Sequence, residues 1–139
     1  MPHLQFKIVT PERVVFEDTV ESVSLPTVDG EITILPHHIP LVSLLCAGEL
    51  RIRKGKEVIP LAVSSGVIEV DGKRVVVLAD TAERADELEE EKIEKAREQA
   101  KKLMEEKRTD VEGFAEASAA LEREIARLKV AKRHRRSRE

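Results

Sequence analysis

The sequence predicts a β + α fold, in which an N-terminal antiparallel β-sandwich (a flattened barrel) precedes a C-terminal antiparallel two-helix hairpin. All six prolines lie at or before Pro60, and five of the six glycines lie at or before Gly72. The later part is rich in Glu, Lys, Arg and Ala, which favour helices. The earlier part alternates apolar and polar residues with a period of two, as half-buried strands do. We therefore expect a β-sandwich domain over 1–85 and a helical hairpin with a basic tail over 86–139.

Alternating or β-branched runs supply the expected strands in chain order. They are Leu4–Ile8, Val20–Leu25 (with one slip in the alternation), Leu50–Arg53, Glu57–Ala62, Val67–Val70 and Val75–Leu78. Gly55 is expected to form the turn between the runs Leu50–Arg53 and Glu57–Ala62. Asp71-Gly72 is expected to join the last two runs as a two-residue turn, because both central positions of such a turn need a positive φ. About seven to ten short strands with closely spaced turns indicate an antiparallel sandwich or flattened barrel.

Two helices are expected after the strands. Asp86, with Glu89 three residues later, resembles a capping box, and an apolar face then continues to about Lys107. Asp110 is a suitable N-cap for a second helix. Because only about two or three residues would join the helices, they must run antiparallel. The expected seam of the second helix is Val111, Phe114, Ser118, Leu121, Ile125 and Leu128.

Alanine is frequent along the expected contact between the helices. Alanine allows close approach but buries little apolar area, so each such contact contributes less than the ~1.5–3 kcal/mol of a buried leucine. The hairpin is therefore predicted to be marginally stable by itself. The alanines concerned are Ala96, Ala100, Ala117 and Ala120.

Composition and motifs exclude several classes of function. A formal net charge of −3 lacks the basic footprint of a nucleic-acid-binding protein. No apolar run reaches the ~18 residues of a membrane span, and the start of the chain lacks the pattern of a signal peptide. The single cysteine, Cys46, lies in an apolar run and fits a reducing cytoplasm, where it would pack as a small hydrophobe. No catalytic or metal-ligand spacing is present, so the chain is expected not to be an enzyme.

The pair His37-His38 stands in a loop bounded by Pro36 and Pro40. One interpretation is a structural loop with one imidazole buried and hydrogen-bonded. A contact surface for a partner is the second interpretation, and a metal-binding or acid–base role is the third.

Three segments together resemble the epsilon subunit of bacterial F-type ATP synthase, and the similarity covers nearly the whole chain. The segments are Gly30–Leu41, Ser65–Val70 and Val77–Ala85. The resemblance implies a non-catalytic central-stalk subunit that couples proton flow through the c-ring to rotary ATP synthesis and restrains ATP hydrolysis through its hairpin. It implies gamma, the c-ring, alpha and beta as partners, and a peripheral location on the cytoplasmic face of the bacterial plasma membrane. Contact with the membrane would arise only through the complex.

The resemblance also assigns residues to the contact with the c-ring and gamma. The Gly30-Glu31 turn is where the family meets the ring, and the loop around His38 is expected in the same contact region. The residues carried over are Asp29, Gly30, Glu31, His38, Pro40 and Leu41.

Some members of the family bind ATP through the hairpin, which makes an ATP-sensing module the alternative function. The corresponding residues here are Leu88, Glu89, Lys92, Arg123 and Arg127. Glu89 and Lys92 replace the usual Asp and Arg of the motif, and lysine lacks the planar fork that grips phosphate. We therefore expect no cofactor other than weakly bound MgATP. Alternatively, Arg123 and Arg127 pair with neighbouring glutamates.

The basic end from Lys129 to Arg138 has two interpretations. It is either a frayed, solvated helix end, or a segment that an extended hairpin would carry toward the catalytic subunits.

Overall fold

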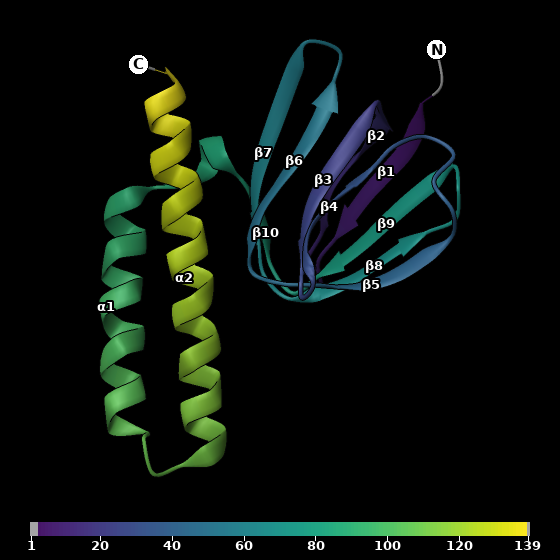
Figure 1. Ribbon diagram of the computed structural model, residues 1–139. Helices are drawn as coiled ribbons and strands as arrows, with labels where there is room; N and C mark the ends of the chain where they lie inside the picture. Colours follow the sequence, from purple (N-terminus) through teal and green to yellow (C-terminus); the bar gives the residue numbers. More distant parts are fainter. Residues whose placement is uncertain (1–2, 139) are drawn as a thin grey trace.

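The computed structural model describes residues 3–138, which form ten strands, one short 3₁₀ helix and two α-helices (Figure 1). The strands are β1 (Leu4–Val9), β2 (Val14–Val20), β3 (Ser22–Thr27), β4 (Gly30–Ile34), β5 (Leu41–Leu45), β6 (Gly48–Lys54), β7 (Glu57–Val63), β8 (Gly66–Val70), β9 (Arg74–Ala79) and β10 (Ala82–Arg84). The helical part consists of the 3₁₀ helix η1 (Ala85–Glu87), α1 (Glu90–Glu106) and α2 (Val111–Arg138). The predicted fold class is confirmed.

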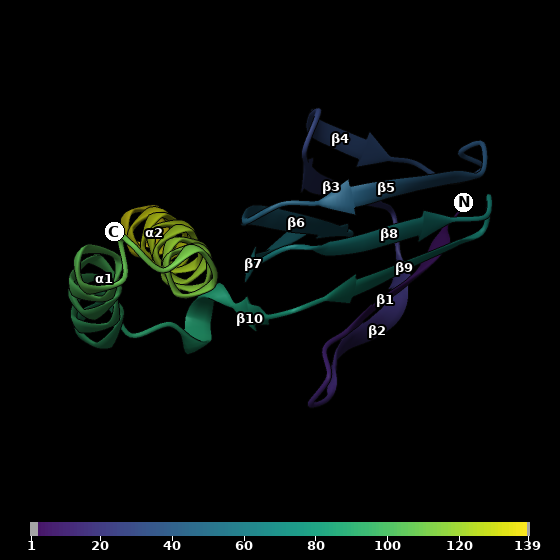
Figure 2. The same cartoon turned by 90° about the horizontal axis from the view of Figure 1, so that it is seen from below.

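The strands form one strongly curved sheet in the order β10-β7-β6-β3-β5-β8-β9-β1-β2, with β4 paired to β3. Neighbouring strands are antiparallel except for β1 and β9, which are parallel. Seen from below, the sheet curves around a central space (Figure 2). An ion pair between Lys54 at the end of β6 and Asp18 on β2 links two strands that are far apart in the sheet order. The result is a nearly closed, flattened barrel.

One continuous apolar core fills this barrel. Along β1, for example, Leu4, Phe6 and Ile8 are buried, whereas the intervening Gln5 is exposed. The rings of Phe6 and Phe16 lie 6.0 Å apart, centroid to centroid. The period-two alternation of the sequence therefore sets which side of each strand faces the core.

One strand prediction and one turn prediction need correction. The run Val20–Leu25 is not one strand, because Glu21 separates β2 from β3 and its N–H donates to the carbonyl of Arg53. The chain changes partner there, from β1 to β6, which explains the slip in the alternation.

The turn between β8 and β9 also differs from the expectation. Asp71 donates its N–H to the carbonyl of Arg74, so the central residues are Gly72 and Lys73 rather than Asp71 and Gly72. Of these two, only Gly72 has a positive φ (91°), as in a type II′ turn. The Gly55 turn between β6 and β7 forms as predicted.

The helices begin and end differently from the prediction at two places. Asp86 lies in η1, and α1 starts after Glu89 without a side-chain cap, so the predicted capping box is wrong. The second helix begins directly after Asp110, as expected, but it continues through the basic tail to Arg138. The interpretation of the tail as a frayed end is therefore wrong.

The buried side of α2 also departs from the predicted seam. Leu128 is buried, but Val111, Phe114 and Ile125 are 85%, 38% and 41% exposed. For Ile125 the reason is that the second half of α2 has two neighbours, α1 on one side and the sandwich on the other (Figure 1). The buried residues there are Glu124, Ala126, Leu128, Val130 and Ala131.

Small residues and ion pairs form the contact between α2 and the sandwich. Val130 packs against Ala62 of β7 and Ala85 of η1. Arg133 pairs with Glu49 of β6 at 3.1 Å, which adds a charged contact beside the apolar one. The first half of α2 extends beyond the sandwich beside α1 alone (Figure 1).

Candidate partner-binding surface

The outward side of the sheet formed by β5, β8, β9 and β1 is unusually apolar. The strand register places Leu44, Val67, Leu78 and Val9 in one row across these strands. Val42 and Val76 lie in the next row, with Glu69 between them and Lys7 on the other side of Val76. Val42 is 72% exposed, Leu44 55% and Leu78 48%. We call these six apolar side chains the outer face. An antiparallel sheet usually turns polar residues to water, and contiguous exposed apolar surface marks sites of interaction.

Two hollows make this surface uneven. They have volumes of about 550 and 500 Å³, and Arg74 and Val76 line both of them. Charged residues that line them, such as Glu17 and Glu69, could fix the orientation of a partner whose apolar side chains fill the hollows.

The loop 35–40 extends the apolar surface at one end of the sheet. Leu35 and Ile39 are 58% and 74% exposed. His37 has a positive φ of 67°, and its N–H donates to the carbonyl of Gly72, which holds the loop against the β8–β9 turn. His38 is half-buried, and its Nδ1 lies 2.7 Å from the carbonyl oxygen of Ile39. The imidazole is hydrogen-bonded as one interpretation expected, but it is only partly buried.

The predicted contact residues fall into two groups. His38, Pro40 and Leu41 adjoin the outer face, and the last two line one of its hollows. Asp29, Gly30 and Glu31, in contrast, lie at the other end of β4, next to the carboxyl end of β5.

Extended β4 places the start of the 35–40 loop about 15 Å from Gly30 at ~3.3 Å per residue. The two groups therefore lie at opposite ends of β4, and their place in one contact region stays a prediction.

The turn at the start of β4 is a rigid, exposed projection. Gly30 has a φ of 113°, which side-chain-bearing residues rarely adopt. The Thr27 hydroxyl donates to the carbonyl of Gly30 and accepts from the N–H of Asp29. Glu31 is half exposed and forms an ion pair with Arg51. Asp29 and Glu31 thus present carboxylates to water from a fixed backbone.

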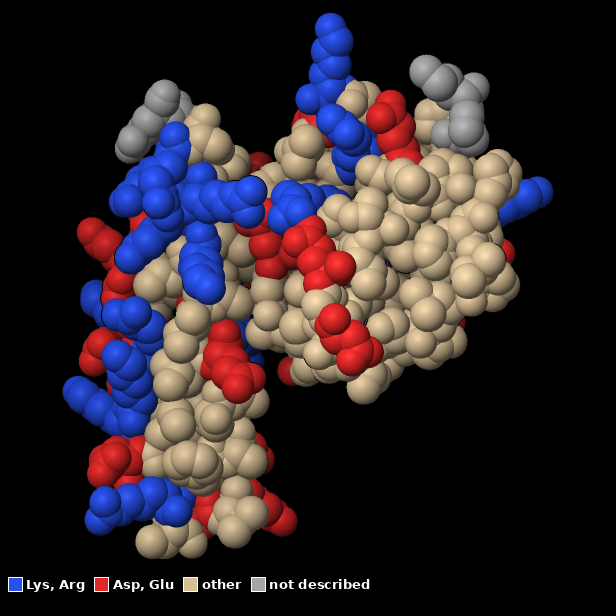
Figure 3. Space-filling model, viewed as in Figure 1, with Lys and Arg blue, Asp and Glu red and all other residues tan. Residues whose placement is uncertain are grey.

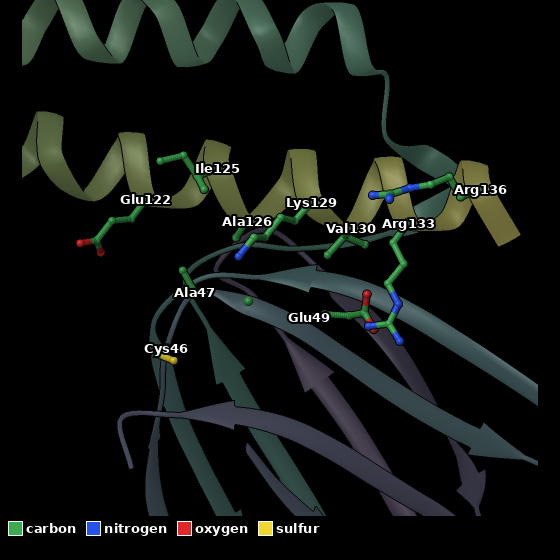
Figure 4. A pocket seen from close by; sticks show the side chains of 11 residues that line it. Cys46, Ala47, Glu49, Glu122, Ile125, Ala126, Lys129, Val130, Arg133 and Arg136 are labelled. Carbon is green, nitrogen blue, oxygen red and sulfur yellow. The ribbon is translucent and has the colours of Figure 1, made fainter. Parts of the chain in front are cut away.

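A third hollow, of about 890 Å³, lies between the β5–β6 corner and α2 (Figure 4). Ala47, Ile125 and Val130 supply apolar walls, and Lys129 and Arg133 supply positive charge. Cys46 lies at one end and is half-buried rather than buried, and its thiol donates to the carbonyl of Thr27. The β5–β6 corner forms one wall of this hollow and α2 forms the other, so the hollow exists only where α2 packs on the sandwich.

The predicted nucleotide-binding residues do not converge. Lys92 pairs with Glu89 at 3.0 Å near the start of α1, where both are well exposed. Leu88 is half-buried against Val130, Leu128 and their neighbours. Arg123 lies on α2 opposite the later part of α1, because Glu90 and Glu94 pair with Arg135 and Lys132.

Arg127 already binds two carboxylates. Its Nη2 lies 2.9 Å from Glu83 of β10, and its Nη1 contacts Glu124 on α2. The pairing of these arginines with neighbouring glutamates is the alternative that the sequence left open. Both terminal nitrogens of Arg127 are therefore occupied by carboxylates, and weak binding of MgATP stays a prediction.

Charge is distributed unevenly between the two parts of the molecule (Figure 3). In this view the helices carry dense Lys, Arg, Asp and Glu, whereas the sandwich away from them is largely uncharged. Within residues 3–138, no group of three or more His, Cys, Asp or Glu side chains is placed to hold a metal ion. None of the helices in this range is apolar over the length that crossing a bilayer requires.

Comparisons with known proteins relate both parts of the chain to one protein. Residues 3–85 match the family model described as the β-sandwich domain of the ATP synthase delta/epsilon chain, and residues 86–132 match its long α-helix domain. The ATP synthase epsilon chain of Herpetosiphon aurantiacus is 48% identical over 129 residues, 93% of this chain and 94% of that protein. The epsilon chain of Dehalococcoides mccartyi is 45% identical over 135 residues, 97% of this chain and 96% of that one.

A solved structure shares the fold. A chain in the cryo-EM structure of the Euglena gracilis mitochondrial ATP synthase (OSCP, F1 and c-ring) aligns with a TM-score of 0.74 and 22% identity. The alignment covers 88% of this chain and 77% of that one.

Proposed function

This chain belongs to the ATP synthase delta/epsilon family, and from that premise we propose that it is the epsilon subunit of the central stalk in a bacterial F-type, proton-translocating ATP synthase. It is a non-catalytic subunit that connects the rotation of the c-ring to ATP synthesis and restrains ATP hydrolysis. The observation that carries the proposal is the outer face, an exposed apolar surface on a sandwich whose own core is complete. Such a surface needs a protein partner to cover it.

We assign the outer face to gamma. Val42, Leu44 and Leu78 together offer a broad apolar area, and the flanking hollows accept side chains of a shaped partner. Burial of aromatic or aliphatic anchors in such hollows supplies most of the binding energy of an interface.

The Asp29–Glu31 turn is assigned to the polar loops of the c-ring. It projects from the sandwich about 15 Å from the 35–40 loop, so both partners can bind at the same time. Its carboxylates suit a partner with basic loops, and a rigid turn loses little entropy on binding. The subunit would in this way sit at the cytoplasmic face of the bacterial plasma membrane without entering it.

The hairpin is assigned a regulatory role toward alpha and beta. Its contact with the sandwich consists of one apolar cluster of small residues and a few ion pairs, so the packed and the extended positions need differ by only a few kcal/mol. A partner that prefers the extended hairpin could therefore select it.

Co-purification with gamma tests the assignment of the outer face. Replacing Val42 and Leu44 together by glutamate should abolish binding of gamma without unfolding the sandwich, because both side chains already face water. Val58→Glu is the matched control, since Val58 is 52% exposed on β7, away from the outer face. Equal loss of gamma in the control, or full binding by the double variant, would overturn the assignment.

ATP hydrolysis by the assembled complex tests the role of the hairpin. A complex that contains the chain ending at Ala85 should hydrolyse ATP faster than one with the full chain. Unchanged hydrolysis would remove the regulatory assignment and leave the stalk role in place.

Replacing Asp29 and Glu31 by lysine should weaken attachment to the c-ring while thermal stability stays the same.

A further inference from the structure

Glu124 is the one charged side chain among the described residues that is buried, with 3% of its surface exposed. It lies on α2, in the half of the helix that packs against both α1 and the sandwich. Removing a carboxylate from water costs several kcal/mol unless cations and hydrogen bonds replace the water. Its surroundings therefore need to supply positive charge.

Two arginines of the same helix supply that charge. Nη1 of Arg127 lies 3.2 Å from Oε2 of Glu124 and also contacts Oε1. Nε of Arg123 lies 3.6 Å from Oε2 of the same carboxylate. Arg127 is thus shared between Glu124 and Glu83, and it links α2 to β10.

The four side chains form a balanced cluster of two cations and two anions. Burial opposes the charged form of Arg127, but hydrogen bonds to Glu83 and Glu124 outweigh it and raise the pKa of the guanidinium above its usual value. An external phosphate would have to add negative charge beside Glu124 in a poorly solvated place, where repulsion is strong. One donor of the cluster is still unused, because Nε of Arg127 is buried without a hydrogen-bond partner.

We propose that Glu124 is an internal counter-ion that takes the place of a phosphate-bearing ligand at Arg123 and Arg127 and keeps such ligands out. The chain holds its hairpin against β10 with its own carboxylates, and an external anion is not needed. Removing the Glu124 carboxylate leaves one glutamate against two arginines. The cluster then has a net positive charge and free guanidinium donors, which are the features that bind phosphate.

Isothermal calorimetry of the full chain with MgATP, and separately with inorganic tripolyphosphate, tests this inference. Glu124→Ala should bind both probes at least about tenfold more tightly than the wild type, because charged hydrogen bonds to phosphate become available. Glu122→Ala is the matched control: it removes the same charge from the same helix, but Glu122 is exposed and does not contact Arg127. The control should bind as weakly as the wild type.

Two further variants keep the test decisive. Glu124→Gln removes the charge with little change of shape, so it reports binding even where alanine loosens the helix. Adding Arg127→Ala to Glu124→Ala should abolish the gain. The inference is overturned if the wild type binds as tightly as Glu124→Ala, if neither Glu124 variant gains affinity, or if Glu122→Ala gains as much. Stalk assembly with gamma is measured separately, so failure here leaves the proposed function intact.

Discussion

The sandwich and the hairpin of this chain are stabilised in different ways. Nineteen buried residues form a single cluster inside the sandwich, most of them Leu, Ile, Val or Phe. The helices belong to much smaller clusters, whose large buried side chains are Ile93, Leu128 and Val130 and whose other buried members are alanines. Ion pairs add to the contact at its edges, but exposed pairs contribute only about 0–1 kcal/mol each. The same chain thus joins a sandwich with a large apolar core to a hairpin with much smaller buried clusters.

The largest expected effect is in the core of the sandwich. Leu50 is fully buried, so Leu50→Ala should lower the free energy of unfolding by about 2–5 kcal/mol through lost burial and a residual cavity. Urea denaturation followed by circular dichroism measures the change. Leu103→Ala on α1 is the control, because Leu103 is 45% exposed and its loss should cost about 0.5 kcal/mol or less. Similar costs at both positions would contradict the contrast between the two parts.

A substitution at a buried position of the hairpin should destabilise the two helices and leave the sandwich unchanged. Ile93 is 1% exposed between α1 and α2, and Ile93→Ala should weaken the hairpin by about 2–3 kcal/mol. Hydrogen exchange should accelerate for amides of α1 and α2 and stay unchanged for those of β1 and β8. Faster exchange throughout the sandwich would mean that the chain unfolds as one cooperative unit.

Removal of the hairpin should affect the sandwich little. The chain 1–85 loses the contacts of Val130 with Ala62 and Ala85, whose small side chains bury little area. Its free energy of unfolding should therefore stay within about 1 kcal/mol of that of the sandwich in the full chain. An unfolded fragment would show that the sandwich depends on α2.

A stabilising substitution is expected in the 35–40 loop. His37 adopts a φ of 67°, which costs a side-chain-bearing residue about 1–2 kcal/mol, and asparagine tolerates it better. His37→Asn should therefore raise the free energy of unfolding by about 0.5 kcal/mol. His38→Asn, at a residue without a positive φ, is the control and should not stabilise. A loss of stability in His37→Asn would indicate that the imidazole itself contributes.

The smallest effect concerns the pair that links β2 to β6. Hydrogen bonds from Lys54 and from the N–H of Thr19 lower the pKa of Asp18, and the Asp18 carboxylate raises the pKa of Lys54. The contribution of Asp18 is therefore complete above its ordinary pKa of about 3.9 and is lost as the pH falls through the lower value in the folded state. Asp18→Asn should be less stable than the wild type at neutral pH and equally stable in strong acid. In a Lys54→Met background the effect of the same substitution should shrink to what the Thr19 hydrogen bond contributes, and an undiminished effect would contradict the ion pair.

The sequence alone was informative where structure is local. Period-two alternation located β1 and β6, β-branched runs located β8 and β9, and Gly55 indicated that β7 follows β6. The change of composition after residue 85 indicated the helices. Both signals arise because side chains that alternate along a strand, or recur every three to four residues along a helix, share one face. The 35–40 loop could likewise be recognised from its flanking prolines, whereas the Asp29–Glu31 turn was identified only through the family resemblance.

The sequence did not show how far apart the two groups of predicted contact residues lie, because proximity in the chain says nothing about the direction of the strand between them. Residues 29–31 and 38–41 are neighbours in the chain, but extended β4 carries them apart. The outer face was not predicted from the sequence, although two of its strands carried a signal. The runs Leu41–Leu45 and Arg74–Ala79 are apolar at both alternating positions, which could have indicated a strand covered on both sides.

Only the tertiary structure decided which faces meet. The outer face exists because β5, β8, β9 and β1 pair in one register, although they are distant in sequence. Glu124 is buried, while Ile125 beside it is 41% exposed, because α2 lies against both α1 and the sandwich. A local pattern specifies which residues share one face of a helix or strand. Which other element packs on that face depends on the free energy of packing between segments that are distant in sequence, and the sequence of one segment does not contain this information.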